Sequence, residues 1–101
     1  MNIFISMPMQ GKTQQQIEQD FNAVADHIIS AHPSACILNS IINDPPPNAT
    51  NSGVWYLGRS LEIMSKADLV AFAKGRQDAR GCAIEHQVAV EYGIPVIEVS
   101  I

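Results

Sequence analysis

Short apolar runs alternate along the chain with longer stretches in which apolar residues recur every three or four positions. Short apolar runs are typical of buried strands, whereas the three-to-four spacing is typical of amphipathic helices. The pattern predicts strands near 3–5, 35–38, 69–73 and 95–99, and helices near 14–31, 54–66 and 82–92. Thr13 and Gln16 have the spacing of a capping box before the first helix, and Gly93 is placed to end the last one.

The order of these elements predicts the fold class. Strands that are separated by helices of ten or more residues pair in parallel through right-handed crossovers. We therefore expect an α/β fold with one domain over residues 1–101, a three-layer flavodoxin-like or half-Rossmann arrangement with four or five parallel strands ordered 2-1-3-4. Ligands bind such sheets beyond the carboxyl ends of the strands, where the strand order reverses. This rule places the crevice between segments 6–13 and 74–81, with Glu85 beside the first of them.

Composition narrows the classes of partner. The chain has a net charge of −4 and no basic stripe, which argues against a nucleic acid polymer as partner but leaves a small nucleotide possible. Apolar residues make up 47 % and charged residues 16 %, so we expect another subunit to cover part of the surface, as in a homodimer or larger homo-oligomer. No apolar run has membrane-spanning length, and the start of the chain lacks the basic residues of a signal peptide. Two cysteines without framework spacing fit reduced thiols, so we expect a cytoplasmic protein without a membrane partner.

A charged segment bounded by glycines, between the third strand and the third helix, is the first candidate for chemistry. It contains Gly75, Arg76, Asp78, Arg80 and Gly81, and Glu85 follows near the start of the helix. The arginines either face an anionic ligand, with Asp78 taking a sugar hydroxyl or a proton, or form a solvated charge cluster. Glu85 is either a first-turn acid that favours its helix dipole or a nucleophile that the dipole keeps ionised.

The opening loop and four further residues are weaker candidates. The loop includes Ser6, Pro8, Met9, Gly11 and Lys12, and the amides of 11–13 could hold a phosphate or merely form a strand-to-helix turn. Trp55 and Tyr56 follow the long irregular segment 39–53 and are candidates for stacking on a base, although Trp55 could equally fill the core. Cys82 and His86 lie four positions apart, but close packing explains this pair better than a metal site or a nucleophile pair. We therefore expect neither a metal nor a cofactor.

Four motifs together resemble a known group of enzymes. They are IFISMPMQG at 3–11, ADLVAF at 67–72, GCAIEH at 81–86 and GIPV at 93–96. The chain resembles the nucleoside 2-deoxyribosyltransferase-like superfamily, and most of all its short bacterial and phage branch, which opens with a Ser-x-Pro-Met-x-Gly loop. It is more distantly similar to the 2'-deoxynucleoside 5'-phosphate N-hydrolases.

The resemblance implies cleavage or transfer of an N-glycosidic bond on a (deoxy)nucleoside or its 5'-monophosphate. Glu85 matches the glutamate that attacks the anomeric carbon and forms a glycosyl-enzyme ester, which water or a second base then resolves. Asp78 matches an acid that supports the leaving base or the sugar, and the opening loop matches a base- or phosphate-binding segment. Ser60 stands where the family has an aspartate that orients the nucleophile and the sugar. Because a serine cannot serve as an anionic partner, two alternatives remain: a nucleotide-binding module with weak or no turnover, acting as a sensor or sequestering protein, and a partner-binding domain with a vestigial pocket.

Overall fold

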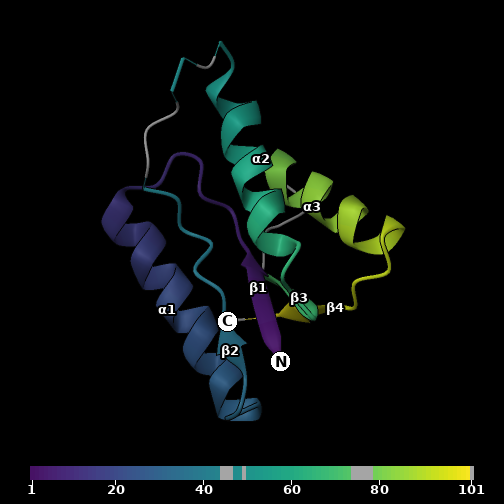
Figure 1. The fold of residues 1–101 in the computed structure, drawn as a ribbon. Helices are drawn as coiled ribbons and strands as arrows, with labels where there is room; N and C mark the ends of the chain where they lie inside the picture. The colour runs from purple at the N-terminus through teal and green to yellow at the C-terminus, as the bar shows by residue number, and fades with distance from the viewer. Residues whose placement is uncertain (44–46, 49, 74–78, 101) are drawn as a thin grey trace.

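The structure is a computed structural model that describes residues 1–43, 47–48, 50–73 and 79–100. Strands and helices alternate along the chain in the order β1 (Asn2–Ser6), α1 (Gln14–Ala31), β2 (Cys36–Ile37), α2 (Ser52–Met64), β3 (Leu69–Ala73), α3 (Arg80–Glu91) and β4 (Val96–Val99). The four strands form one parallel sheet with the order β2-β1-β3-β4 (Figure 1). The predicted α/β fold, its parallel pairing and its strand order are therefore confirmed.

The helix boundaries follow local capping chemistry. Thr13 and Gln16 form the predicted capping box, and α1 begins at the next residue after Thr13. The side chain of Asn51 accepts a hydrogen bond from the amide of Val54, so α2 begins two residues before its predicted start. Helix α3 also begins two residues early, at Arg80, after an extended Ala79. Gly93 has a φ of +73°, as expected of the residue that stops a helix.

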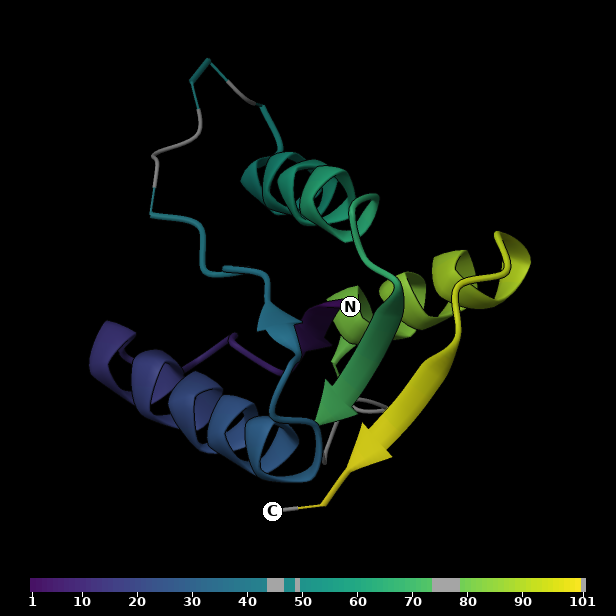
Figure 2. The ribbon, with the colours of Figure 1, turned by 60° about the horizontal axis from the view of Figure 1, so that its bottom comes forward.

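The helices cover both faces of the sheet, with α1 on one face and α2 and α3 on the other (Figure 2). The strand order explains this division. The connection from β1 to β2 runs toward one edge of the sheet, whereas the connections from β2 to β3 and from β3 to β4 run toward the other edge. Because each crossover is right-handed, connections that run in opposite directions place their helices on opposite faces. Ile3 and Ile5 of β1 pack with α1, whereas Phe4 packs with Met64 of α2 and Ala89 of α3. Two apolar cores therefore lie on opposite faces of the same strands.

The alternation along β1 decides where its last side chain lies. Ser6 comes two positions after Phe4, so it faces α2 and α3 at the carboxyl end of the strand. Ser6 pairs in register with Phe72 of β3, whose ring contacts the ring of His86 on α3 at 5.0 Å. The carboxyl ends of β1 and β3 and helix α3 therefore meet around Ser6. No helix among the described residues combines the length and the apolar character needed to cross a membrane.

Candidate functional site

A buried hydrogen bond joins the first strand to the third helix. The hydroxyl of Ser6 donates to Oε1 of Glu85 over 2.6 Å, although the two residues are 79 positions apart in the chain. Ser6 is 2 % exposed and Glu85 is 7 % exposed. A carboxylate this deeply buried is uncommon in proteins, and a charged group in such a place marks a candidate functional site.

Burial raises the pKa of Glu85, and the hydrogen bond from Ser6 offsets this rise only in part. We expected the dipole of α3 to favour the ionised form of this carboxylate. Because α3 begins at Arg80, Glu85 lies in the second turn, beyond the first-turn amides that stabilise an anion. Because of its burial, the carboxyl of Glu85 holds its proton to a higher pH than an ordinary glutamate, so its pKa is raised.

Glu85 and Ser6 line a cavity of about 200 Å³, here called the inner cavity, between the end of β1, helix α2 and the start of α3. Two further serines line it: Ser60 from α2, and Ser40, whose hydroxyl donates to the carbonyl of Ile5 over 3.1 Å. The structure thus brings together seven of the residues selected from the sequence, namely Ser6, Pro8, Met9, Ser60, Arg80, Gly81 and Glu85.

A second hollow of about 350 Å³, here called the outer cavity, adjoins the inner one. The two share the lining residues Gln10, Gly53, Leu57, Arg80 and Gly81. Val54 and Ile84 add apolar walls to the outer cavity, and Asn51 adds a polar one. Together the two cavities reach the size of small-molecule sites in proteins, about 300–1,000 Å³.

The entrance to both cavities favours an anion. Arg80 and Gly81 are the first two residues of α3 and line both hollows. Among the described residues no side chain caps this end of the helix. First-turn amides, the helix dipole and a guanidinium therefore converge at one place, which is the arrangement that binds phosphate and carboxylate groups.

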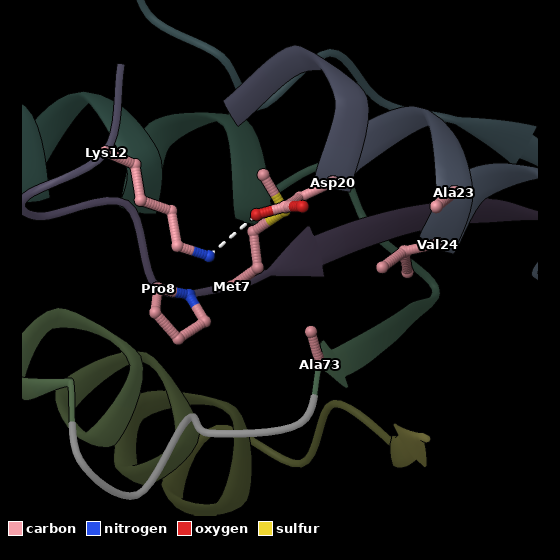
Figure 3. A pocket seen from close by; sticks show the side chains of 7 residues that line it. All are labelled: Met7, Pro8, Lys12, Asp20, Ala23, Val24 and Ala73. Atoms are coloured by element: carbon pink, nitrogen blue, oxygen red, sulfur yellow. Dashed lines mark hydrogen bonds and ion pairs between the residues drawn. The ribbon is translucent and has the colours of Figure 1, made fainter. Parts of the chain in front are cut away.

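Lys12 does not reach the Glu85 cavities. Its ammonium Nζ lies 2.7 Å from the carboxylate of Asp20 on α1, and Figure 3 shows the side chain extended toward that residue. Lys12 lines a separate hollow of about 340 Å³ on the α1 face, which has Met7 and Pro8 in common with the inner cavity. Gly11 has a φ of +80° and lines none of the three hollows described here.

The predicted phosphate cradle at residues 11–13 is largely occupied by the protein itself. The amide of Lys12 donates to the carbonyl of Met9 over 3.2 Å. The amide of Thr13 donates to the side chain of Gln16 over 2.9 Å within the capping box. The structure therefore favours an ordinary strand-to-helix turn, which was the alternative interpretation of this loop.

Trp55 lies outside the inner cavity, and its neighbour lines it instead. The half-buried ring of Trp55 packs edge-to-face against Tyr56, with centroids 4.9 Å apart and an interplanar angle of 82°. Tyr56 and Ser60 lie four positions apart and line the inner cavity from one side of α2. That spacing was a signal for Tyr56 in the sequence. Ser40 offered no such signal, because it lies in an irregular segment.

Three predicted site residues, Gly75, Arg76 and Asp78, lie outside the described residues. Within the described ranges no group of three or more histidine, cysteine or acidic side chains could hold a metal ion. His86 instead makes its ring contact with Phe72, and Cys82 is buried against the inner cavity. Close packing therefore accounts for this pair.

A family model described as "Domain of unknown function (DUF4406)" matches residues 1–98. No curated protein and no solved structure gave a match to this sequence. The matched range includes β1 to β3, all three helices, β4 except its last residue, and every residue of the cavities described above. The chain therefore belongs to the DUF4406 family.

Proposed function

We propose that this protein cleaves or transfers the N-glycosidic bond of a nucleoside or nucleoside 5'-monophosphate, with Glu85 as the nucleophile. One observation carries the proposal: a buried carboxyl, held by Ser6, lines a cavity at the carboxyl ends of the central strands. This is where parallel α/β sheets bind their ligands. The motifs shared with the nucleoside 2-deoxyribosyltransferase-like superfamily assign the same role to Glu85.

The chemistry proceeds in two steps. In the first, the Glu85 oxygen that Ser6 does not hold forms a bond to C1' of the sugar while the C1'–N bond breaks. The electron pair of that bond leaves with the base, which takes up a proton. In the second, a water oxygen bonds to C1', the ester C1'–O bond breaks, and its electron pair returns to the carboxylate while the water releases a proton to solvent. In transfer, the ring nitrogen of a second base replaces the water.

The two cavities divide the substrate between them. The inner cavity binds the sugar, because C1' must lie next to the Glu85 oxygen that attacks it. The apolar walls of Val54 and Ile84 take the flat base in the outer cavity. Arg80 and the first-turn amides of α3 bind the phosphate of a nucleotide. The resemblance assigns to Asp78 an acid that supports the leaving base or the sugar, and the reaction needs no cofactor.

Two observations favour a second candidate, a nucleotide-binding module with weak or no turnover. The pKa of Glu85 is raised by burial, which lowers the ionised fraction at a given pH. Ser60, which lines the same cavity, cannot supply the negative charge of the family's aspartate. A module of this kind would hold the nucleotide with the same residues and act as a sensor or sequestering protein.

One experiment separates the candidates. The protein is incubated with a panel of nucleosides and 5'-monophosphates, and released base is measured by chromatography. Glu85→Gln should lower the rate by roughly a thousandfold or more, because it removes the nucleophilic charge. Glu91→Gln is the matched control, since Glu91 is an exposed residue of the same helix. Equal release by wild type and Glu85→Gln would rule out the nucleophile, whereas binding without release would support the module.

We also propose that the chain self-associates through α2. Of the residues in this helix only Met64 is buried, while Val54 is 64 % exposed and Tyr56 is 37 % exposed. Apolar side chains left on one helix are typical of a contact between subunits. Light scattering at micromolar concentration should give a dimer or larger species, and a monomer of 11.0 kDa would contradict the proposal.

A further inference from the structure

Two serines in the inner cavity already donate their hydroxyl protons to other groups of the protein. The Ser6 hydroxyl donates to Oε1 of Glu85 over 2.6 Å, and the Ser40 hydroxyl donates to the carbonyl of Ile5 over 3.1 Å. A serine hydroxyl has one proton but two acceptor lone pairs. Both oxygens therefore face a ligand as acceptors, and the carboxylate of Glu85 is an acceptor as well.

The two serines lie at the same strand end. Ser40 is held by the carbonyl of Ile5, the residue directly before Ser6. Ser6 is 2 % exposed and Ser40 is 3 % exposed, so a sugar in the inner cavity would exclude water from both. A ligand hydroxyl that donates to a spare lone pair of these oxygens adds a hydrogen bond that a ligand without that hydroxyl cannot make. The cavity thus matches a ligand with two neighbouring hydroxyl groups.

The proposed reaction places Ser6 next to C2'. When one oxygen of Glu85 bonds to C1', the other oxygen and the hydroxyl that holds it lie against the atoms attached to C1'. The 2'-hydroxyl of a ribosyl group can donate a hydrogen bond to the oxygen of Ser6 there. A 2-deoxyribosyl group has only hydrogen on C2' and leaves that acceptor unpaired.

We propose that this site selects ribosyl over 2-deoxyribosyl substrates, with Ser6 accepting a hydrogen bond from the 2'-hydroxyl and Ser40 accepting one from the 3'-hydroxyl. The inference rests on the proposed function of the same cavity and names its substrate class. It departs from the 2-deoxyribosyl preference that the resemblance implies.

Binding is measured by calorimetry in a Glu85→Gln background, which prevents cleavage and retains an amide oxygen that accepts the proton of Ser6. The probes are pairs of ribonucleoside and 2'-deoxyribonucleoside 5'-monophosphates with the same base, one pair for each of four bases. The ribonucleotide should bind at least about tenfold more tightly, as expected when a site built around a hydroxyl meets an analogue that lacks it.

Two single substitutions assign the preference to its residue. Adding Ser6→Ala should lower ribonucleotide affinity to that of the deoxynucleotide and leave deoxynucleotide affinity nearly unchanged. Adding Ser40→Ala should weaken both nucleotides equally, because both carry the 3'-hydroxyl. Ser30→Ala is a control without effect, since Ser30 makes the same kind of bond to a carbonyl on α1, over 2.9 Å. If a variant fails to fold, the arabinosyl nucleotide tests the parent protein, because its 2'-hydroxyl points to the other face and should bind like hydrogen.

The outcomes separate this inference from the proposed function. Tighter ribonucleotide binding without release of base by wild type would rule out the proposed enzymatic function but support the proposed selectivity. Release of base from deoxynucleotides alone would keep the function and overturn the selectivity. Equal affinity for the two sugars, tighter deoxynucleotide binding, or no binding of either nucleotide would each overturn the inference.

Discussion

Replacing Glu85 by glutamine should stabilise the folded protein at neutral pH, although the same change should abolish the proposed catalysis. Burial raises the pKa of the Glu85 carboxyl above its ordinary value of 4.5. The folded protein therefore keeps a proton over a pH range in which the unfolded chain has already released it. Stability falls as pH rises from the ordinary value to the raised pKa, and it stays lower above that range. Glutamine is neutral at every pH, so it avoids this loss while its amide oxygen accepts the hydrogen bond from Ser6.

The size of the gain follows from how completely the carboxyl is removed from water. Glu85 is 7 % exposed, and the hydrogen bond from Ser6 only partly offsets the desolvation. Each unit by which the pKa is raised lowers the free energy of unfolding at neutral pH by about 1.4 kcal/mol. For a domain of this size 1 kcal/mol corresponds to roughly 4 °C in Tm, so one unit corresponds to roughly 5–6 °C.

The assay is thermal unfolding followed by circular dichroism between about pH 4 and pH 8. The Tm of Glu85→Gln minus that of wild type should be near zero at the acid end and should grow through the range above 4.5. Glu91→Gln should show no such growth, because Glu91 is exposed on the same helix. A difference that is constant with pH, or a less stable glutamine variant at neutral pH, would refute the claim that burial controls this carboxyl.

Four further outcomes are expected. Ser6→Ala should extend the pH window of the stability loss upward, because the hydrogen bond from Ser6 lowers the pKa of Glu85, and pH-dependent melting of the variant measures this. The kcat/KM of the proposed reaction should fall on the acid side through the raised pKa of Glu85, and a profile that follows an ordinary glutamate would contradict it. In urea unfolding, Gly93→Ala should lower the free energy of unfolding by about 1 kcal/mol, because Gly93 has a φ of +73°. Gly58→Ala should instead raise it by about 0.5–1 kcal/mol, because Gly58 lies in the middle of α2 with no atom near the added Cβ. Lys12→Met should change stability by less than about 1 kcal/mol and leave nucleotide affinity unchanged, because its exposed ion pair lies on the other face of the sheet.

The arrangement of the strands could be predicted from the sequence. The strong periodicity of the apolar residues and the right-handedness of crossover connections leave few alternative topologies. The capping box at Thr13 and the stop at Gly93 also specified two helix ends correctly. The start of α3 was harder, because its N-cap is Ala79, whose side chain makes no capping bond. A shift of two residues moved Glu85 from the first turn of α3 into the second.

The contacts of single side chains also differ in whether they could be predicted from the sequence. The position of Ser6 could have been derived, since strand alternation places it with Phe4 and the crossovers place α3 on that face. The partner of Lys12 could not, because Asp20 is eight positions away and lies outside the spacing of helical neighbours. Ser40 reaches the inner cavity through a segment without periodicity, so only the folded chain shows it there.

The raised pKa of Glu85 sets a condition on how the proposed nucleophile becomes available. Within the described residues Glu85 takes part in no ion pair, and its one hydrogen bond comes from the neutral Ser6. In the proposed reaction, a positive charge that stabilises the carboxylate arises on the substrate, where C1' and the ring oxygen become oxocarbenium-like as the base departs. A carboxylate stripped of water interacts with that charge more strongly than a hydrated one does, because the local dielectric constant is low. Burial thus weakens ionisation in the empty site and strengthens the interaction that matters in the transition state, which explains how one residue can destabilise the fold and still suit the proposed chemistry.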